Sequence, residues 1–306
     1  MIMRVWLRKR KINKKIITNR KKLHEFLKKE NAQSLSVAKI HPYKSSNTLC
    51  VLASGKSINE ITNDQWAFIK KQDSLSLNNT ILHKFIPTFL FYETDTDDEA
   101  HNALSVLKFE NLIQRADDFK DVPIIWHYQE KRYFDIDKLR NNNLLDNSYF
   151  QTSYSLPGDT PEDFQTSLEY VKGKGLNKEI DVGLYRRGSL ARILHFALAL
   201  GYEEVVFFGA DLVNADYFFD TYTDQDLPKG CKNPNMKEYT YNSKAGLKTQ
   251  SSLHMTVDKS VHPVTMFDVI DKINHYWLKP NNLTLRIAHD SSALKSILPL
   301  KDWKSI

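Results

Sequence analysis

A segment in the second half of the chain, Ser189–Asp211, restricts the fold most strongly. It begins as an amphipathic helix whose apolar residues share one stripe: Leu190, Ile193, Leu194, Ala197 and Leu198. Gly201 ends this helix, and Glu204–Phe208 is a short apolar run typical of a strand buried on both faces. The strand ends in Gly209-Ala-Asp211, and the carboxyl ends of such strands are where open α/β sheets bind ligands. The segment therefore predicts an α/β fold with a mostly parallel sheet.

A second unit of the same kind lies near the start of the chain. Thr48–Ala53 predicts a buried strand, the turn Ser54-Gly-Lys-Ser57 follows, and Glu60–Lys71 has helical spacing. Ser57 and Glu60 fit a capping box at the start of that helix. The remaining expected strands are Asp73–Asn79, Pro87–Tyr92, Val122–His127 and Leu283–Ala288, and the remaining expected helices are Asp97–Asp117, Val264–Trp277 and Ser291–Leu298.

The charge of the chain is concentrated at its start. The 306 residues carry a net charge of +6, yet residues 1–30 alone hold twelve Lys or Arg against Glu25 and Glu30, a local balance of +10. We therefore expect a basic N-terminal arm over residues 1–46 and a nearly neutral domain over residues 47–306. The arm is either a solvated helix or a peripheral anchor on an anionic inner-membrane surface. No nucleic-acid recognition motif follows it, so a nucleic-acid partner is not expected.

The composition excludes several classes of protein. Cys50 and Cys231 are too few for a disulfide framework or a four-thiolate zinc site. No run of eighteen apolar residues is present, and a basic run directly follows the short apolar start Met1–Trp6, which is unlike a signal peptide. We therefore expect a cytoplasmic protein, with membrane contact limited to the periphery.

Three clusters of residues suggest binding or catalysis. The turn at Gly55, Lys56 and Ser57 is no P-loop, because Cys50 stands where the first glycine is required, but its backbone N–H groups suit a phosphate. Arg186-Arg-Gly188-Ser189 offers cations and backbone donors at a helix start, which suits a phosphate or a carboxylate. His254 and His262 are candidates for a general acid or base.

Two further features border these clusters. Residues 212–253 lack periodicity and are rich in Tyr, which predicts a lid over about 212–262. Asp95 and Asp97 fit either a metal clamp or the acidic start of a helix, and we favour the helix start. No metal and no cofactor are therefore expected.

In their order along the chain, these segments resemble the bacterial sialyltransferases of glycosyltransferase family 42 and related CMP-sugar transferases. The resemblance rests on Val51–Ile61, on Asn78, on a long block from Arg186 to Asp220, and on a His-bearing loop followed by a helix and a strand. It implies a Rossmann-like variant of the GT-A fold with a small lid. It also implies an inverting, metal-independent transfer from a CMP-activated acidic sugar.

The resemblance assigns roles to particular residues. It implies a nucleotide pocket formed by Ser54, Gly55, Asn78, Ser189, Gly209 and Asp211. Arg186 is expected near the donor, Tyr217 on the departing phosphate, and a histidine as the base. Spacing to the following helix favours His262, whereas the loop context favours His254. Two positions depart from the family: Glu93 replaces an Asn and Val213 replaces a Tyr, so sialic acid, another nonulosonic acid and Kdo all stay open as the sugar.

The leading hypothesis is a glycosyltransferase that acts on a glycan or glycolipid acceptor. Two alternatives remain: a pterin diphosphokinase-like enzyme of the same wider fold group, and a non-catalytic scaffold in glycan assembly. Homo-oligomerisation is a further expectation that the sequence leaves open.

Overall fold

A parallel sheet forms the centre of the computed structural model, which describes residues 2–93, 99–129, 135–213, 216–234, 254 and 256–303. Within these residues every strand pairing is parallel, and the order is β1-β6-β5-β4-β3-β2-β8-β9, with β7 beside the second half of β6. The strands are β1 (Gln33–Ser34), β2 (Thr48–Leu52), β3 (Asp73–Leu77), β4 (Phe89–Tyr92), β5 (Ile124–His127), β6 (Ser148–Ser155), β7 (Val182–Tyr185), β8 (Glu204–Phe208) and β9 (Thr284–Ile287). The predicted α/β, Rossmann-like fold class is confirmed.

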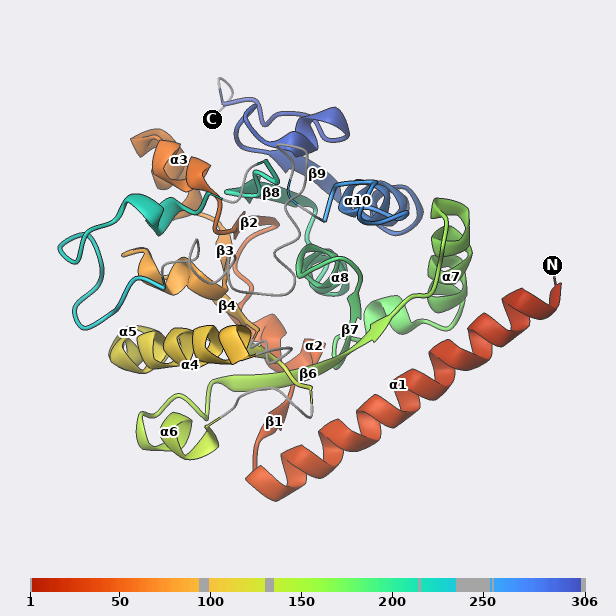
Figure 1. Cartoon of the computed structure of the whole chain (residues 1–306), viewed down its shortest axis with the longest axis horizontal. Coiled ribbons are helices and arrows are strands. Elements are labelled where there is room, and N and C mark those ends of the chain that lie inside the picture. Colours follow the sequence, from red (N-terminus) through yellow and green to blue (C-terminus); the bar gives the residue numbers. More distant parts are fainter. Residues whose placement is uncertain are drawn as a thin grey trace.

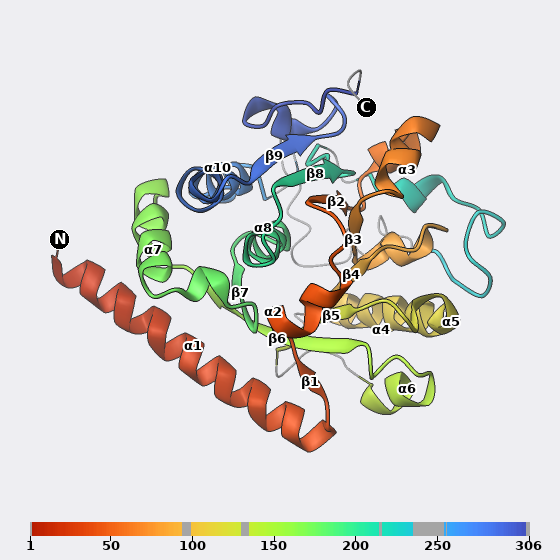
Figure 2. The same cartoon turned by 180° about the vertical axis from the view of Figure 1, so that it is seen from behind.

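Helices cover both faces of this sheet (Figures 1 and 2). Helices α7, α8 and α10 lie on one face, and α3 to α6 lie on the other. The helices are α1 (Ile2–Glu30), α2 (Val37–Ile40), α3 (Asn63–Ile69), α4 (Glu99–Gln114), α5 (Ala116–Phe119), α6 (Ile136–Asn141), α7 (Pro161–Gly173), α8 (Leu190–Ala199) and α10 (Met266–Ile273).

Because side chains alternate along a strand, each central strand contributes side chains to two hydrophobic cores, one on each face of the sheet. In β8, Val205 and Phe207 belong to the core beneath α8, whereas Val206 and Phe208 belong to the core on the opposite face. This two-sided burial explains why the strand is an unbroken apolar run rather than an alternating one.

The order of the strands creates a switch point beside β2. From β2 the chain adds β3, β4, β5 and β6 on one side, and it later places β8 and β9 on the other. The connections that leave β2 and β8 therefore diverge at the carboxyl edge of the sheet, which opens a crevice there.

The basic N-terminal segment belongs to this domain. Ile12 and Ile16 of α1 are buried in the same core as residues of α7 and α8, and β1 pairs with β6. Arg8 forms an ion pair with Asp163, and Arg20 donates to Asp181 at 2.8 Å. The expected boundary at residue 46 therefore does not separate two independently packed units.

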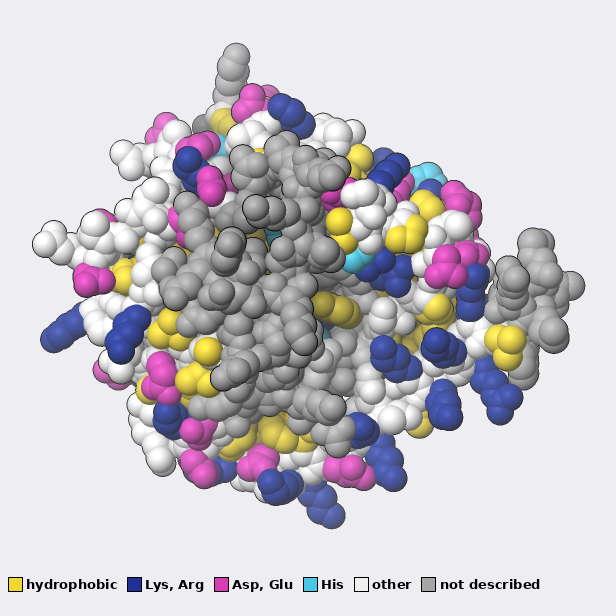
Figure 3. Space-filling model, in the orientation of Figure 1, with side chains coloured by type: hydrophobic (Ala, Val, Ile, Leu, Met, Phe, Trp, Pro, Cys, Tyr) yellow, Lys and Arg dark blue, Asp and Glu magenta, His cyan; other side chains and the backbone are white. Residues whose placement is uncertain are grey.

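The outer face of α1 is strongly cationic. Its described lysines that point away from the domain include Lys14, Lys21 and Lys28, seven residues apart and all exposed. Figure 3 shows Lys and Arg side chains gathered along the edge where α1 runs in Figure 1. None of the helices in the described ranges is long and apolar enough to span a bilayer.

Several local predictions need correction. The capping box at residues 57 and 60 is wrong: Thr62 caps α3 together with Gln65, and Ser57 is instead bound to Asp211. The expected helix over Val264–Trp277 is α-helical only in α10 and continues as a π-helical turn. Elements β1, β6, β7, α2, α6 and α7 were not predicted from the sequence.

The start of the expected lid is part of the packed domain. Phe218 and Phe219 are buried in the core beneath α3 and α4, and Asn233 donates to the carbonyl of Phe219 at 2.7 Å. Residues 235–253, which belong to the expected lid, lie outside the described residues.

The packing of α1 yields a stability prediction with a matched control. Ile16→Ala removes a buried side chain and should lower the free energy of unfolding by about 2–5 kcal/mol. Ile17→Ala, at a side chain that is 68% exposed, should change it by less than about 0.5 kcal/mol. Chemical denaturation of both variants provides the measurement, and equal effects would contradict the docking of α1.

Candidate functional site

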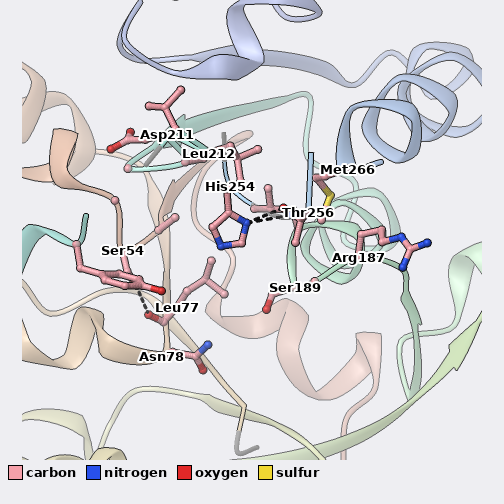
Figure 4. Close-up of a pocket in the computed structure, with 18 of the residues that line it drawn as sticks. Ser54, Leu77, Asn78, Arg187, Ser189, Asp211, Leu212, His254, Thr256 and Met266 are labelled. Carbon is pink, nitrogen blue, oxygen red and sulfur yellow. Dashed lines mark hydrogen bonds between the residues drawn. The ribbon is translucent and has the colours of Figure 1, made fainter. Parts of the chain in front are cut away.

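A cavity of about 250 Å³ lies at the carboxyl ends of β2, β3 and β8. Four short segments and single residues from distant parts of the chain form its walls (Figure 4). They are Ala53–Gly55, Leu77–Asn78, Arg187–Leu190, Gly209–Val213, Asp216, Tyr217, His254, Thr256 and Met266.

Close packing between two turns fixes the floor of the cavity. The N–H of Gly55 donates to the carbonyl of Gly209 at 2.8 Å. A Cβ on Gly55 would lie 2.4 Å from that carbonyl oxygen, and one on Gly209 would lie 2.6 Å from Ile58. Only glycine fits at both positions, because any side chain would force the two turns apart.

Asp211 stabilises the contact between the two turns, and its carboxylate is occupied by that contact. Its Oδ2 accepts the backbone N–H of Ser57 at 2.9 Å, and its Oδ1 accepts the Ser57 hydroxyl. The side chain is buried, and in Figure 4 it points away from His254. Asp211 therefore ties the turn after β8 to the turn after β2.

Strained backbone is concentrated around the cavity. Asn78, Arg187 and Leu212 have φ values of 46°, 61° and 53°, although none is a glycine, and Gly188 and Gly209 are also left-handed. All five residues line the cavity. Such conformations cost free energy and are most often retained where function requires them.

One wall of the cavity is suited to an anion. Gly188, Ser189 and Leu190 bring the first turn of α8 to the cavity, where backbone N–H groups lack helical partners. Arg187 also lines the cavity, although its guanidinium points away from Ser189 and His254 (Figure 4), and its Nε donates to the carbonyl of Val264 at 2.8 Å. Partial burial lowers the pKa of Arg187, but an arginine remains cationic at neutral pH.

A buried ion pair stands behind this wall. Ser189 does not cap α8 with its hydroxyl, which instead donates to Glu93 Oε2 at 2.5 Å. Glu93 also pairs with Arg192, a fully buried residue of α8 whose pKa burial lowers to about 9. Ser189 is thus held by a charged pair, which leaves its oxygen lone pairs available to the cavity.

Asn78 is oriented by a backbone contact. Its Oδ1 accepts the N–H of Glu93 at 2.7 Å. In Figure 4 the amide nitrogen of Asn78 points toward the cavity and the oxygen points away. The side chain therefore presents a hydrogen-bond donor to a ligand.

His254 and Tyr217 also line the cavity. Burial lowers the pKa of His254, so its imidazole is neutral at pH 7, and burial together with Asp220 raises the pKa of Tyr217. Both side chains can donate a hydrogen bond to a ligand without carrying a formal charge.

Not every expected residue reaches the cavity. Of the residues expected there, Ser54, Gly55, Asn78, Gly188, Ser189, Gly209, Asp211, Tyr217 and His254 line it. Ser57 is buried against Asp211, and Lys56 is exposed to solvent outside the lining.

Arg186 and His262 also lie outside the cavity lining. Arg186 donates to the carbonyls of Leu156 and Gly158, so it holds the loop after β6. His262 is half-buried near Arg187, and its pKa is lowered by that burial and by the two arginine charges. The cavity lining therefore includes His254 but not His262, contrary to what the spacing to the following helix favours. It likewise includes Arg187 but not Arg186.

Other lining residues were missed from the sequence. Thr256, Met266 and Asp216 have no motif of their own, and the partnership of Glu93 with Arg192 joins residues almost a hundred positions apart. The one available signal was the arginine within the apolar helix of α8, because a buried charge requires a partner.

The structure does not describe the two acids that fit either a metal clamp or the start of a helix. Asp95 and Asp97 lie outside the described residues. Among the residues that the structure does describe, no group of three or more His, Cys, Asp or Glu side chains is arranged to hold a metal ion.

Comparisons with known proteins add no assignment. No model of a known protein family matches the chain, and no similar sequence was found among curated proteins.

The contact between the two turns yields a second prediction. Gly55→Ala should lower the free energy of unfolding by about 1–3 kcal/mol or more, because its Cβ would collide with Gly209 and Asp211. Gly173→Ala, where a Cβ meets nothing within 4 Å, should leave stability unchanged or raise it by up to about 1 kcal/mol. Thermal and chemical denaturation test both variants, and a neutral Gly55→Ala would contradict the described floor.

Proposed function

We propose that the chain is an inverting glycosyltransferase that moves an acidic sugar from a CMP donor to a glycan or glycolipid acceptor. Sialic acid, another nonulosonic acid and Kdo are the candidate sugars. The observation that carries the proposal is the convergence, on one cavity at the switch point of a parallel sheet, of the α8 N-terminus, Arg187, Tyr217 and His254.

The donors in this cavity match a monophosphate leaving group. When a CMP-sugar reacts, the departing phosphate gains negative charge, which preorganised donors and a cation can stabilise. Backbone N–H groups at Gly188 to Leu190 and the neutral side chains of Tyr217 and His254 supply the donors, and Arg187 adds a positive charge to the lining. We therefore propose that the reaction proceeds without a metal ion.

The neighbouring part of the cavity suits the nucleoside. Asn78 presents an amide donor, and Ser54 and Leu77 provide small polar and apolar surface beside it. A cytosine ring and a ribose both offer acceptors for such a donor. The proposal therefore places the nucleoside near the ends of β2 and β3 and the phosphate near α8.

The outer face of α1 supports a peripheral position on an anionic membrane. Because Ile12 and Ile16 fix the inner face of the helix to the domain, the lysines on the outer face are held as one rigid array. Leu7 and Ile17 are exposed among them, and an apolar side chain between cations suits a lipid headgroup region. We propose that this array brings the enzyme to a membrane-bound acceptor.

A nucleotide panel tests the enzymatic proposal. CMP should raise the melting temperature more than CDP, UDP, GDP or ATP, since a ligand at 100 times its Kd stabilises the native state by about 2.7 kcal/mol. Cytidine, which lacks the phosphate, should have a much smaller effect. Arg187→Gln should reduce the difference in melting-temperature shift between CMP and cytidine, because it removes a positive charge from the cavity lining.

The same panel identifies the alternatives. A larger shift with ATP would favour a diphosphokinase-like enzyme, and no shift with any nucleotide would favour a scaffold. Release of CMP from CMP-activated sialic acid or Kdo should continue in EDTA, and a loss that Mn²⁺ restores would contradict metal-independent transfer.

Charge variants of α1 test the membrane proposal without removing the helix. Neutralising Lys14, Lys21 and Lys28 to Gln should weaken binding to anionic vesicles about 100-fold, at about 1 kcal/mol for each lysine. The matched control neutralises three exposed lysines elsewhere, Lys70, Lys71 and Lys295. Vesicle sedimentation at constant salt provides the measurement, and equal binding of both triple variants would overturn the proposal.

A further inference from the structure

The ring of His254 is fixed by its own loop. The N–H of His254 donates to the carbonyl of Leu212 at 3.0 Å, and its carbonyl accepts the N–H of Val257 at 2.9 Å. Nδ1 of the imidazole lies 2.9 Å from the Thr256 hydroxyl and accepts the Thr256 backbone N–H at 3.3 Å. Three backbone contacts and one hydroxyl contact therefore determine how the ring faces the cavity.

These contacts determine the tautomer. A backbone N–H can only donate, so Nδ1 must keep its lone pair to accept it. The Thr256 hydroxyl can then donate to Nδ1 as well. In a neutral imidazole the single proton consequently resides on Nε2. Burial, which lowers the pKa of His254, favours that neutral form.

The protonated nitrogen faces the ligand side. Figure 4 shows the ring joined to Thr256 at one nitrogen, while the other nitrogen points into the cavity on the side of Ser54 and Ser189. Nε2 forms no hydrogen bond to any residue within the described ranges. The donor is therefore positioned for a ligand.

We propose that His254 acts as a neutral hydrogen-bond donor, through Nε2–H, to the phosphate of the CMP-sugar, with Thr256 as the residue that fixes its tautomer. This inference rests on the proposed function, and it changes the role of the histidine. A ring with a proton on Nε2 and a donor against Nδ1 has no free lone pair with which to remove the proton of an acceptor hydroxyl.

The bonds and protons of the transfer can be accounted for while His254 keeps its proton on Nε2. The bond between the anomeric carbon and the phosphate oxygen breaks, and its electron pair leaves on the phosphate, to which Nε2–H donates. The acceptor oxygen forms the new bond to the anomeric carbon. Its proton passes to Asp216, a carboxylate that lines the cavity and forms no hydrogen bond within the described ranges.

Two substitutions at one position separate a donor from a base. Gln retains a side-chain N–H donor but has no basic nitrogen, whereas Ala lacks both. His254→Ala should weaken CMP binding about 10- to 100-fold, the loss expected for a hydrogen bond to a charged group. His254→Gln should retain CMP affinity and turnover to within about tenfold, and His262→Ala provides the matched control.

The opposite pattern would overturn the proposal. If His254 is the base, Gln and Ala should both reduce kcat by about 10²- to 10⁴-fold and leave CMP affinity unchanged. Asp216→Asn should reduce kcat on that same scale with little change in CMP affinity, and full activity of this variant would overturn the proton path.

A spectroscopic measurement tests the tautomer without any substrate. Long-range ¹H–¹⁵N correlation of the full chain, with the His254 signal assigned by its loss in His254→Gln, should show the proton on Nε2. A proton on Nδ1 in a chain that binds CMP would overturn the donor role alone. If the proton is on Nε2 but the chain binds no CMP, the proposed function is overturned, and a CMP-sugar is not the ligand to which His254 donates.

Discussion

The parallel pairing of β2 with β8 is the constraint on which the candidate site depends. It places the ends of two strands that are about 150 residues apart in sequence at one edge of the sheet. The turns that leave them approach so closely that Gly55 and Gly209 must both lack a side chain. Asp211 then bonds to Ser57 and closes the contact. The floor of the cavity is therefore a direct consequence of sheet topology. The two glycines are required because a Cβ at either position would collide with the neighbouring turn.

The wall of the cavity that suits an anion depends on a second, buried interaction. Arg192 lies inside α8, and a cation there is tolerated because Glu93 pairs with it across the sheet. Glu93 in turn accepts from Ser189 and donates its N–H to Asn78. Glu93 thus positions the start of α8 through its carboxylate and the amide of Asn78 through its backbone N–H. Glu93 consequently organises two of the residues that line the cavity.

Val213 contributes only an apolar side chain to the cavity. This position therefore offers no hydroxyl to a phosphate. Tyr217 and His254 are uncharged donors in the same lining, and the donor role proposed for His254 is consistent with this arrangement. The cavity is thus a set of donors that suits an anionic group, whereas the identity of the sugar depends on contacts beyond the phosphate.

The sequence by itself determined the α/β fold class, most of the central strands and helix α8, because apolar runs and helical spacing are local properties. It also placed Ser54, Asn78 and Ser189 near strand or helix ends, where parallel sheets bind ligands. It could not determine that α1 belongs to the domain, because a basic helix and a docked basic helix have the same composition, and only the burial of Ile12 and Ile16 distinguishes them. Only the tertiary structure places His254 and Arg187 in the cavity lining and leaves His262 and Arg186 outside it. It alone pairs Glu93 with Arg192. Each of these outcomes depends on which side chains the fold brings within a few ångströms of one another.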